Sequence, residues 1–360
     1  MQSIMERALE FLSDYGLFLA KVVTFVIAVV VVIAVAATSI QNSRGEGDDE
    51  GELTVRRLNE KYRKLREAIE MRMLSQDQRK LLKKARQKAD KLKKKKAGKS
   101  AEGKEKEIRP KTFVIDFDGD IKASDTETLR KSVTAVLSVA EPGRDEVVVR
   151  LESGGGLVHA YGLAASQLDR IRGKGVHLTA CVDKVAASGG YMMACVADRI
   201  VASPFAVLGS IGVVAQLPNF HRVLKKHDVD YEILTAGEHK RTLTLFGENT
   251  EKGRRKFLED LEDTHHLFKD YVRERRPDLD VDKVSNGDIW FGTRALEVNL
   301  VDEIRTSDEY LIDACDRSDV VSVSFQRKRT LPEKLGLATS AALEATVWRV
   351  LSAFRNQNIQ

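Results

Sequence analysis

The chain has 360 residues, more than one typical domain needs, and 42% of them are hydrophobic, which is enough to bury a core. Its net charge of +5 is unevenly spread, because residues 55–111 carry 23 Lys and Arg against 8 Asp and Glu, which leaves the rest of the chain acidic. The odd number of cysteines, Cys181, Cys195 and Cys315, and their spacing argue against a disulfide framework and a zinc site. We expect them to be small buried hydrophobic residues.

The first element in chain order is an apolar run at residues 17–40, LFLAKVVTFVIAVVVVIAVAATSI, which follows an N-terminal segment at 1–16. No charge interrupts it from Val22 to Ala37, and a helix of about 20 apolar residues crosses a bilayer. We expect an uncleaved transmembrane anchor, with a signal peptide cleaved after Ala34-Val35-Ala36 as the alternative. The basic stretch 55–111 favours a cytoplasmic body by the positive-inside rule, whereas the acidic residues 46–52 oppose it, so these residues leave the membrane side open.

Residues 41–111 are predicted to form a basic helical stalk and a linker. Residues 53–97 lack Gly and Pro, and Leu58, Leu65, Ile69 and Met73 fall at helical spacing, which predicts one long charged helix. It would act as a stalk or coiled-coil spacer, or lie with its basic face on anionic lipid headgroups. No nucleic-acid recognition motif follows, so we expect no nucleic-acid partner.

The folded body is expected at residues 112–326, where strand-like and helix-like segments alternate. This alternation predicts an α/β fold. The expected strands are 112–117, 147–151, 176–182, 199–202 and one after Gly209, with a further strand-like stretch at 231–234; the expected helices are 126–140, 158–173, one opened by Ser188 and ending near Val196, 251–276, and shorter ones within 278–315. The tail 327–360 contains an amphipathic pattern over 333–355, which would contact either the membrane or its own domain.

Ser188 is the first candidate for chemistry, within VDKVAASGGYMMACVADRI at 182–200. A serine hydroxyl becomes a nucleophile when a base removes its proton. Gly189 follows it, and an N–H at the start of a helix has no intrahelical partner, so that of Gly189 is a candidate donor to an oxyanion. The alternative is an ordinary helix N-cap, for which serine is favoured.

Two further segments supply possible partners for Ser188. The run Ser153-Gly154-Gly155-Gly156 follows an apolar strand, and Gly155 or Gly156 would provide a second oxyanion donor, unless the glycines only make a tight turn. Lys240 is a candidate base in TAGEHKRTLTLFGENT, although a solvated surface lysine is the alternative. A lysine base has to be neutral, which usually requires burial.

The sequence gives weaker support to a catalytic histidine and to a bound metal or cofactor. His159 and His239 lie near the glycine run and Lys240, so a Ser188–His triad stays open. The chain has no His-Glu-x-x-His, Cys-x-x-Cys, Walker or dinucleotide motif, so we expect no metal and no cofactor.

Taken together, LESGGGLVHAYGLAASQL, VDKVAASGGYMMACVADRI, LGSIGVVAQLPNF and TAGEHKRTLTLFGENT resemble the signal peptide peptidase A family, and within it the SohB branch. The resemblance covers nearly the whole chain. It implies a Clp-protease/crotonase-like fold of stacked β-β-α units, preceded by a transmembrane helix and a long charged helix.

The resemblance also implies a serine peptidase with a Ser–Lys dyad that needs no cofactor. Ser188 matches the family nucleophile, Lys240 the general base and Ser210 a serine that orients the lysine, while Gly156 and Gly189 match the oxyanion hole. Two departures are Gly154, where the family pattern has proline, and Asn299, where relatives often have glycine.

Family members with one catalytic domain form ring- or dome-shaped homo-oligomers in which the dyad can be shared between subunits. We therefore expect a single-pass protein of the bacterial inner membrane with a periplasmic catalytic domain, held in lipid by residues 17–40 and cleaving unfolded peptides, signal-peptide remnants or membrane-protein fragments. The alternatives are a non-catalytic scaffold of the same fold, to which Gly154 is the only pointer, and a crotonase-like acyl-thioester enzyme.

Overall fold

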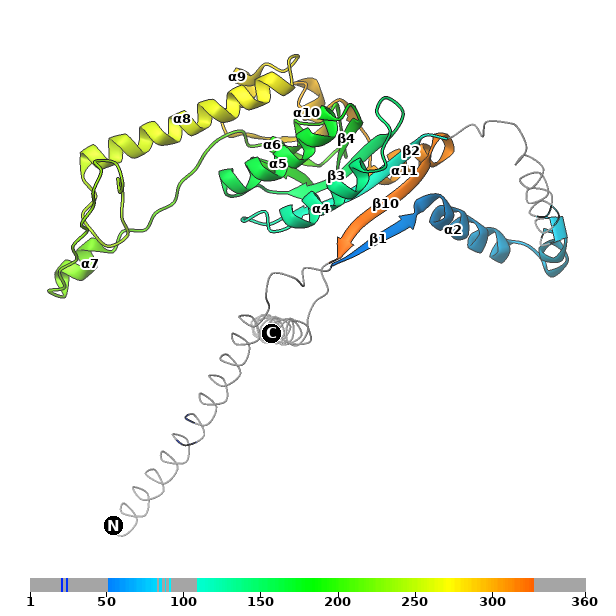
Figure 1. Cartoon of the computed structure of the whole chain (residues 1–360), viewed down its shortest axis with the longest axis horizontal. Coiled ribbons are helices and arrows are strands. Elements are labelled where there is room, and N and C mark those ends of the chain that lie inside the picture. The colour runs from blue at the N-terminus through cyan, green and yellow to red at the C-terminus, as the bar shows by residue number, and fades with distance from the viewer. Residues whose placement is uncertain are drawn as a thin grey trace, which may run out of the picture. The chain divides into compact units, whose positions relative to one another are not determined.

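The computed structural model of the protein describes residues 51–82 and 109–326, together with residues 21, 24, 84, 85, 88 and 91 (Figure 1). The expected anchor at 17–40, except Lys21 and Thr24, and the tail at 327–360 lie outside the described residues. Within the described part, no helix has the length and apolar character needed to cross a membrane. Residues 53–326 form one compact unit.

The described residues contain ten strands in one sheet. They are β1 (Glu52–Arg57), β2 (Lys111–Gly119), β3 (Glu146–Ser153), β4 (His177–Val182), β5 (Val185–Ala187), β6 (Arg199–Ala202), β7 (Val207–Gly209), β8 (Ile289–Phe291), β9 (Glu303–Ile304) and β10 (Asp319–Gln326). The labelled helices are α2 (Leu58–Met73), α4 (Thr126–Leu137), α5 (Val158–Gly173), α6 (Gly189–Ala194), α7 (His221–Lys226), α8 (Glu251–Arg275), α9 (Val281–Val284), α10 (Gly292–Glu297) and α11 (Ser307–Arg317), and residues 76–82 are helical as well.

The main path of the sheet runs β1-β10-β2-β3-β4-β6-β9, and its pairs from β10 to β9 are parallel. A side branch leaves it where Ser153 of β3 pairs with Ala186 of β5. Strand β5 pairs in parallel with β7, which pairs antiparallel with β8. The branch begins at the carboxyl end of β3, where the glycine run follows.

Helices cover the two faces of the sheet unequally. The larger buried cluster lies between the sheet and helices α4, α5 and α6, with Phe268 and Val272 of α8 added (Figure 1). The smaller cluster joins Val114 and Val148 of the other face to α11 and to Leu58 at the start of α2. The central strands are buried on both faces, which explains continuous apolar runs such as Val147-Val148-Val149.

Local signals place several helix ends. Thr250 caps α8 by accepting a hydrogen bond from the Gly253 N–H. Thr306 and Glu309 form a reciprocal capping box at the start of α11.

The structure confirms most of the predicted elements, with ends that differ by a few residues. They are the strands 112–117, 147–151, 176–182 and 199–202 and the helices 126–140, 158–173 and 251–276.

Three expectations about secondary structure are wrong. The stretch 53–97 is not one continuous helix, because β1 precedes α2 and a bend at Leu74 ends α2 at Met73; residues 76–82 beyond the bend are helical again, as expected. No strand follows Gly209 up to Val214, because the strand in this region, β7, ends at that glycine. Residues 231–234 are not a strand either, since they have no neighbouring strand to pair with.

Candidate active site

Ser188 lies where β5 ends and α6 begins, and its backbone is held in an unusual conformation. Its φ of 53° and ψ of −118° are rare for a residue with a side chain, and such a conformation persists only where surrounding contacts impose it. The Ser188 N–H donates to the Gly209 carbonyl at 2.8 Å, and its own carbonyl accepts from the Met192 N–H at 2.9 Å. The side chain makes no capping hydrogen bond to α6, so the N-cap interpretation of this serine is not supported.

The glycine run lies directly against Ser188. A Cβ atom added to Gly155 would stand 2.6 Å from the Gly189 nitrogen and 2.8 Å from the Ser188 Cβ. Gly155 also has a φ of +87°, so both its conformation and its surroundings require glycine. The structure therefore brings together the glycine run and the Ser188-Gly189 step, as the sequence predicted.

The two candidate donors in the glycine run differ in their hydrogen bonding. The Gly155 N–H donates to the Ser153 Oγ at 3.1 Å. The Gly156 N–H has no hydrogen-bond acceptor among the described residues, and the next N–H, of Leu157, donates to the Ile121 carbonyl at 2.9 Å. Gly156 is thus the glycine of this pair whose N–H remains available to a ligand.

Ser210 occupies the position after β7 that corresponds to Ser188 after β5. The two strands pair in parallel with Ala187 opposite Gly209, so the two serines follow neighbouring strand ends. Ser210 also has a positive φ, 49°, and its N–H donates to the Asp288 carbonyl at 2.6 Å. Both serines are partly exposed.

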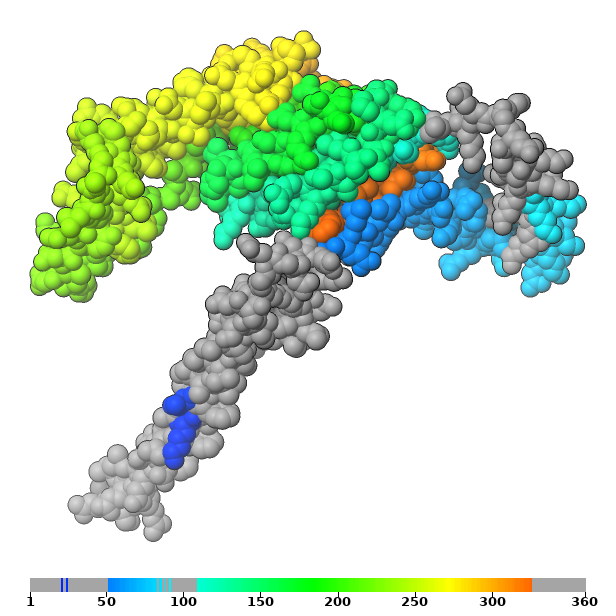
Figure 2. Space-filling view, viewed as in Figure 1, coloured from blue at the N-terminus to red at the C-terminus, as the bar shows by residue number. Residues whose placement is uncertain are grey.

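Lys240 lies in a long excursion between β7 and α8, which we call the arm and define as residues 213–250. Figures 1 and 2 show the arm, which includes α7, reaching away from the sheet at the far end of α8. Lys240 is exposed, and its N–H donates to the Gly237 carbonyl at 3.2 Å. Among the described residues its side chain makes no hydrogen bond or ion pair, so the structure does not join it to Ser188 or Ser210.

The contacts of His159 and His239 do not support a Ser188–His triad. His239 is exposed beside Glu238, with 3.9 Å between the His239 Nε2 and a carboxylate oxygen. His159 is exposed on the first turn of α5, and no hydrogen bond joins either histidine to Ser188 in the described part of the chain.

Two buried side chains beneath the glycine run were not singled out from the sequence. They are Ser153 and Tyr161, whose hydroxyl oxygens lie 2.6 Å apart and whose exposed fractions are 2% and 0%. Burial raises the pKa of Tyr161, so the phenol stays protonated at neutral pH. Local pattern offers no sign of this pairing, because it depends on how α5 folds back under the loop.

The cysteines have no place in this arrangement. Cys181 and Cys195 are buried, and burial raises the pKa of each thiol to about 12, which keeps it in the unreactive protonated form. No cluster of metal-binding side chains occurs among the residues that the structure describes.

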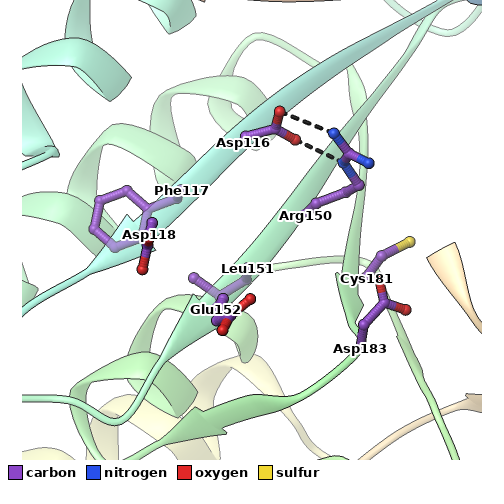
Figure 3. A pocket seen from close by; sticks show the side chains of 8 residues that line it. All are labelled: Asp116, Phe117, Asp118, Arg150, Leu151, Glu152, Cys181 and Asp183. Atoms are coloured by element: carbon purple, nitrogen blue, oxygen red, sulfur yellow. Dashed lines mark hydrogen bonds and ion pairs between the residues drawn. The ribbon is translucent and has the colours of Figure 1, made fainter. Parts of the chain in front are cut away.

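A separate polar cavity of about 230 Å³ opens on the sheet face that carries the smaller buried cluster (Figure 3). Asp116 and Arg150, from neighbouring strands β2 and β3, form a bidentate ion pair at its wall, at 2.6 and 2.9 Å. Cys181 on β4 is the register partner of Arg150, and Asp183 follows just after that strand. None of the predicted catalytic residues lines this cavity, so we treat it as distinct from the Ser188 site.

Comparison with known proteins places the chain in a family. Residues 10–168 match the family described as Peptidase family S49 N-terminal, and residues 170–320 match Peptidase family S49. The chain belongs to peptidase family S49. Its expected membership of the SohB branch of signal peptide peptidase A-like proteins is confirmed by the relatives that follow.

A "Probable protease SohB" of Haemophilus influenzae is 47% identical over 336 residues, which are 91% of this chain and 92% of that protein. A "Probable protease SohB" of Buchnera aphidicola subsp. Schlechtendalia chinensis is 44% identical over 313 residues, 84% of this chain and 99% of the relative. Among solved structures, "1510-N membrane-bound stomatin-specific protease S97A mutant" is similar over 57% of this chain and 84% of its own, with 12% identity and a TM-score of 0.38. The strands and helices described above make this SohB-branch peptidase a mixed α/β protein.

Proposed function

We propose that this S49 peptidase is a serine endopeptidase in which Ser188 is the nucleophile and Lys240 the general base. The observation that carries the proposal is the backbone of Ser188, held at a φ of 53° with Gly155 packed against it. A serine held in a rare conformation beside available N–H groups has the arrangement that acyl transfer requires.

The proposed reaction uses residues of this chain alone. Lys240 in its neutral form takes the Ser188 hydroxyl proton as the Oγ forms a bond to the peptide carbonyl carbon. The Gly156 and Gly189 N–H groups donate to the carbonyl oxygen as it becomes negative. The C–N bond then breaks, the amine leaves with the proton from Lys240, and a water molecule cleaves the acyl-enzyme by the same steps in reverse.

We further propose that Lys240 reaches the Ser188 site of a second copy of the chain. Its side chain is exposed and has no polar partner among the described residues, and the arm extends away from its own sheet (Figure 2). The arm also exposes apolar side chains, including Leu234 at 91% and Val214 at 80%, as an unoccupied protein interface would. Burial in that interface would favour the neutral form of the lysine.

The rest of the assignment follows the family resemblance. We propose a Clp-protease/crotonase-like fold and a homo-oligomer held in the bacterial inner membrane by residues 17–40, with the catalytic domain in the periplasm. The substrates would be unfolded peptides, signal-peptide remnants or fragments of membrane proteins, which can enter such a site as extended chains.

The test is peptide cleavage by the full-length protein in detergent, with Ser188→Ala and Lys240→Ala as variants. Each substitution alone should abolish cleavage, and labelling by a fluorophosphonate should require Ser188. Coexpression of the two variants in one assembly should restore about a quarter of wild-type activity, because a random assembly completes that share of its shared sites.

Two results would contradict parts of this proposal. No restoration on coexpression would place both dyad residues in one chain. An inactive wild type that a fluorophosphonate does not label would favour the non-catalytic scaffold.

A further inference from the structure

Ser153 and Tyr161 form a buried polar pair underneath the glycine run, in a region otherwise filled by apolar side chains. Their hydroxyl oxygens are 2.6 Å apart, and Tyr161 belongs to the main hydrophobic cluster. Burying two hydroxyls is unfavourable unless each of them is hydrogen-bonded. Their placement therefore points to a role that a pair of apolar side chains would not fill.

The hydrogen bonds of this pair have one consistent direction. A tyrosine hydroxyl has one proton, and that of Tyr161 is donated to the Asp120 carbonyl at 2.7 Å. The Ser153 Oγ lies 3.3 Å from the Gly119 carbonyl but only 2.6 Å from the Tyr161 Oη, so we assign its one proton to the shorter contact with Tyr161, while it accepts from the Gly155 N–H at 3.1 Å. The result is a chain from the Gly155 N–H through both hydroxyls to the Asp120 carbonyl, in which each bond polarises the next.

The same two residues also touch the Ser188-Gly189-Gly190 step. A Cβ atom on Gly189 would lie 2.4 Å from the Tyr161 Cγ, so the ring is packed against the Gly189 backbone. A Cβ atom on Gly190 would lie 2.4 Å from the Ser153 carbonyl oxygen. One buried pair therefore supports both backbone segments that carry the proposed oxyanion donors.

We propose that Ser153 and Tyr161 are positioning residues that set the spacing between the Gly156 and Gly189 N–H groups. The inference rests on the proposed function, because it assigns the pair a role in that same oxyanion hole. The pair touches no substrate atom. It acts by holding Gly155, and with it the turn at Gly156, at a set distance from Gly189.

The test is steady-state peptide cleavage by full-length Tyr161→Phe and Ser153→Ala. Removing one oxyanion donor costs about 100- to 1000-fold in kcat, and a displaced donor should cost less, so we expect kcat to fall roughly tenfold with KM little changed. The affinity for a peptide boronate, which mimics the tetrahedral state, should fall by about the same factor. The double variant should lose no more than either single variant, because both substitutions break one chain of hydrogen bonds.

A matched control is Tyr310→Phe. Tyr310 is 3% exposed and its hydroxyl bonds Glu146 at 2.5 Å, but it lies in α11 on the other face of the sheet. It should lose stability as Tyr161→Phe does while keeping kcat and boronate affinity.

The possible outcomes separate this inference from the proposed function. If the wild type cleaves, Ser188→Ala does not, and Tyr161→Phe and Ser153→Ala match Tyr310→Phe in kcat, the positioning role is overturned and the peptidase stands. A wild type that neither cleaves nor reacts with a fluorophosphonate overturns both. If Tyr161→Phe fails to fold, Ser153→Ala decides the question alone, since it removes a single oxygen atom.

Discussion

The two halves of the proposed dyad come from regions built in opposite ways. Around Ser188 the backbone is fixed by hydrogen bonds, and the flanking Ala187 and Gly189 are buried. Around Lys240 the arm is mostly exposed, and its hydrogen bonds lie largely within the arm itself, such as those from Asn219 to the Thr244 and Gly247 carbonyls. Within one chain, the surroundings of Ser188 are therefore fixed by buried contacts, whereas those of Lys240 are not. We call these two regions the finished half and the unfinished half of the proposed site.

This difference separates what a single subunit can preorganise from what we assign to assembly. Electrostatic stabilisation of an oxyanion requires donors that are already in place, and in our proposal the close packing of Gly155 against Gly189 holds the Gly156 and Gly189 N–H groups there. A lysine base requires desolvation, which the exposed arm does not provide by itself. An enzyme arranged in this way would cleave only when assembled.

The largest expected effect comes from disturbing the finished half. Gly155→Ala would place a Cβ atom 2.6 Å from the Gly189 nitrogen at a φ of +87°, so one of the two segments must move. We expect kcat for peptide cleavage to fall more than about 100-fold, as for loss of an oxyanion donor. Gly162→Ala is the control, because a Cβ there meets nothing within 4 Å, and equal losses in the two variants would contradict this account.

Sequence patterns predicted the finished half better than the unfinished one, because its signals are local. Buried strands such as β3 and long helices such as α5 and α8 show in runs of adjacent residues. The glycine run and Ser188 follow strands, and parallel strands end at one edge of a sheet, so their meeting could be inferred before the structure.

The missed features depend on contacts that the sequence pattern does not show, some of them between distant parts of the chain. The charged segment of β1 has the composition of a helix, yet it lies at the edge of the sheet beside β10, where Asn59 at the start of α2 accepts a hydrogen bond from the Val320 N–H, 261 residues later. Strand β10, by contrast, is rich in β-branched residues, which favour strands, so it could have been predicted from the sequence. The Ser153–Tyr161 pair and the open placement of Lys240 follow from loop paths that no local pattern encodes.

The second prediction tests whether the exposed arm docks on a second copy of the chain. Leu234→Asp removes the most exposed of its apolar side chains and should leave the fold intact, because the side chain is 91% exposed. If the arm docks on a second copy, a buried charge should weaken that interface, and we expect about a tenfold loss of cleavage at low protein concentration. Sedimentation in detergent should show smaller assemblies.

Val139→Asp provides the matched control for the arm. Val139 is 55% exposed and follows α4, away from the arm, so its substitution should change neither assembly nor activity. If both variants behave alike, the arm is an ordinary exposed loop.

The third prediction concerns the stability of the body alone. The Asp145 side chain is fully buried before β3; burial favours its neutral form, but hydrogen bonds from the Glu141 and Lys111 N–H groups and from Arg144 hold its pKa below the usual 3.8. Asp145→Asn should lower the free energy of unfolding by about 1.5–3 kcal/mol at neutral pH.

The pH dependence of that difference follows from the direction of the shift. A depressed carboxyl pKa stabilises the folded state above the unfolded value and loses this contribution as the pH falls through the folded value. The gap between wild type and Asp145→Asn in denaturant titrations should therefore be constant above about pH 5 and narrow below 3.8. Asp278→Asn, at an exposed carboxylate without a side-chain hydrogen bond among the described residues, should show no such gap.

The smallest expected effect lies at Gly154, where the family pattern has proline. Ser153 before it is extended in β3, a Cβ at Gly154 meets nothing within 4 Å, and its N–H donates no hydrogen bond among the described residues, so proline meets these three local requirements. Gly154→Pro should raise the free energy of unfolding by about 0.4–1 kcal/mol, because proline reduces the conformational entropy of the unfolded chain. Gly154→Ala should give part of that gain. A fall in kcat on Gly154→Pro, measured beside Gly154→Ala, would mean that the first glycine must flex during turnover, and the finished half would then be less rigid than its hydrogen bonds imply.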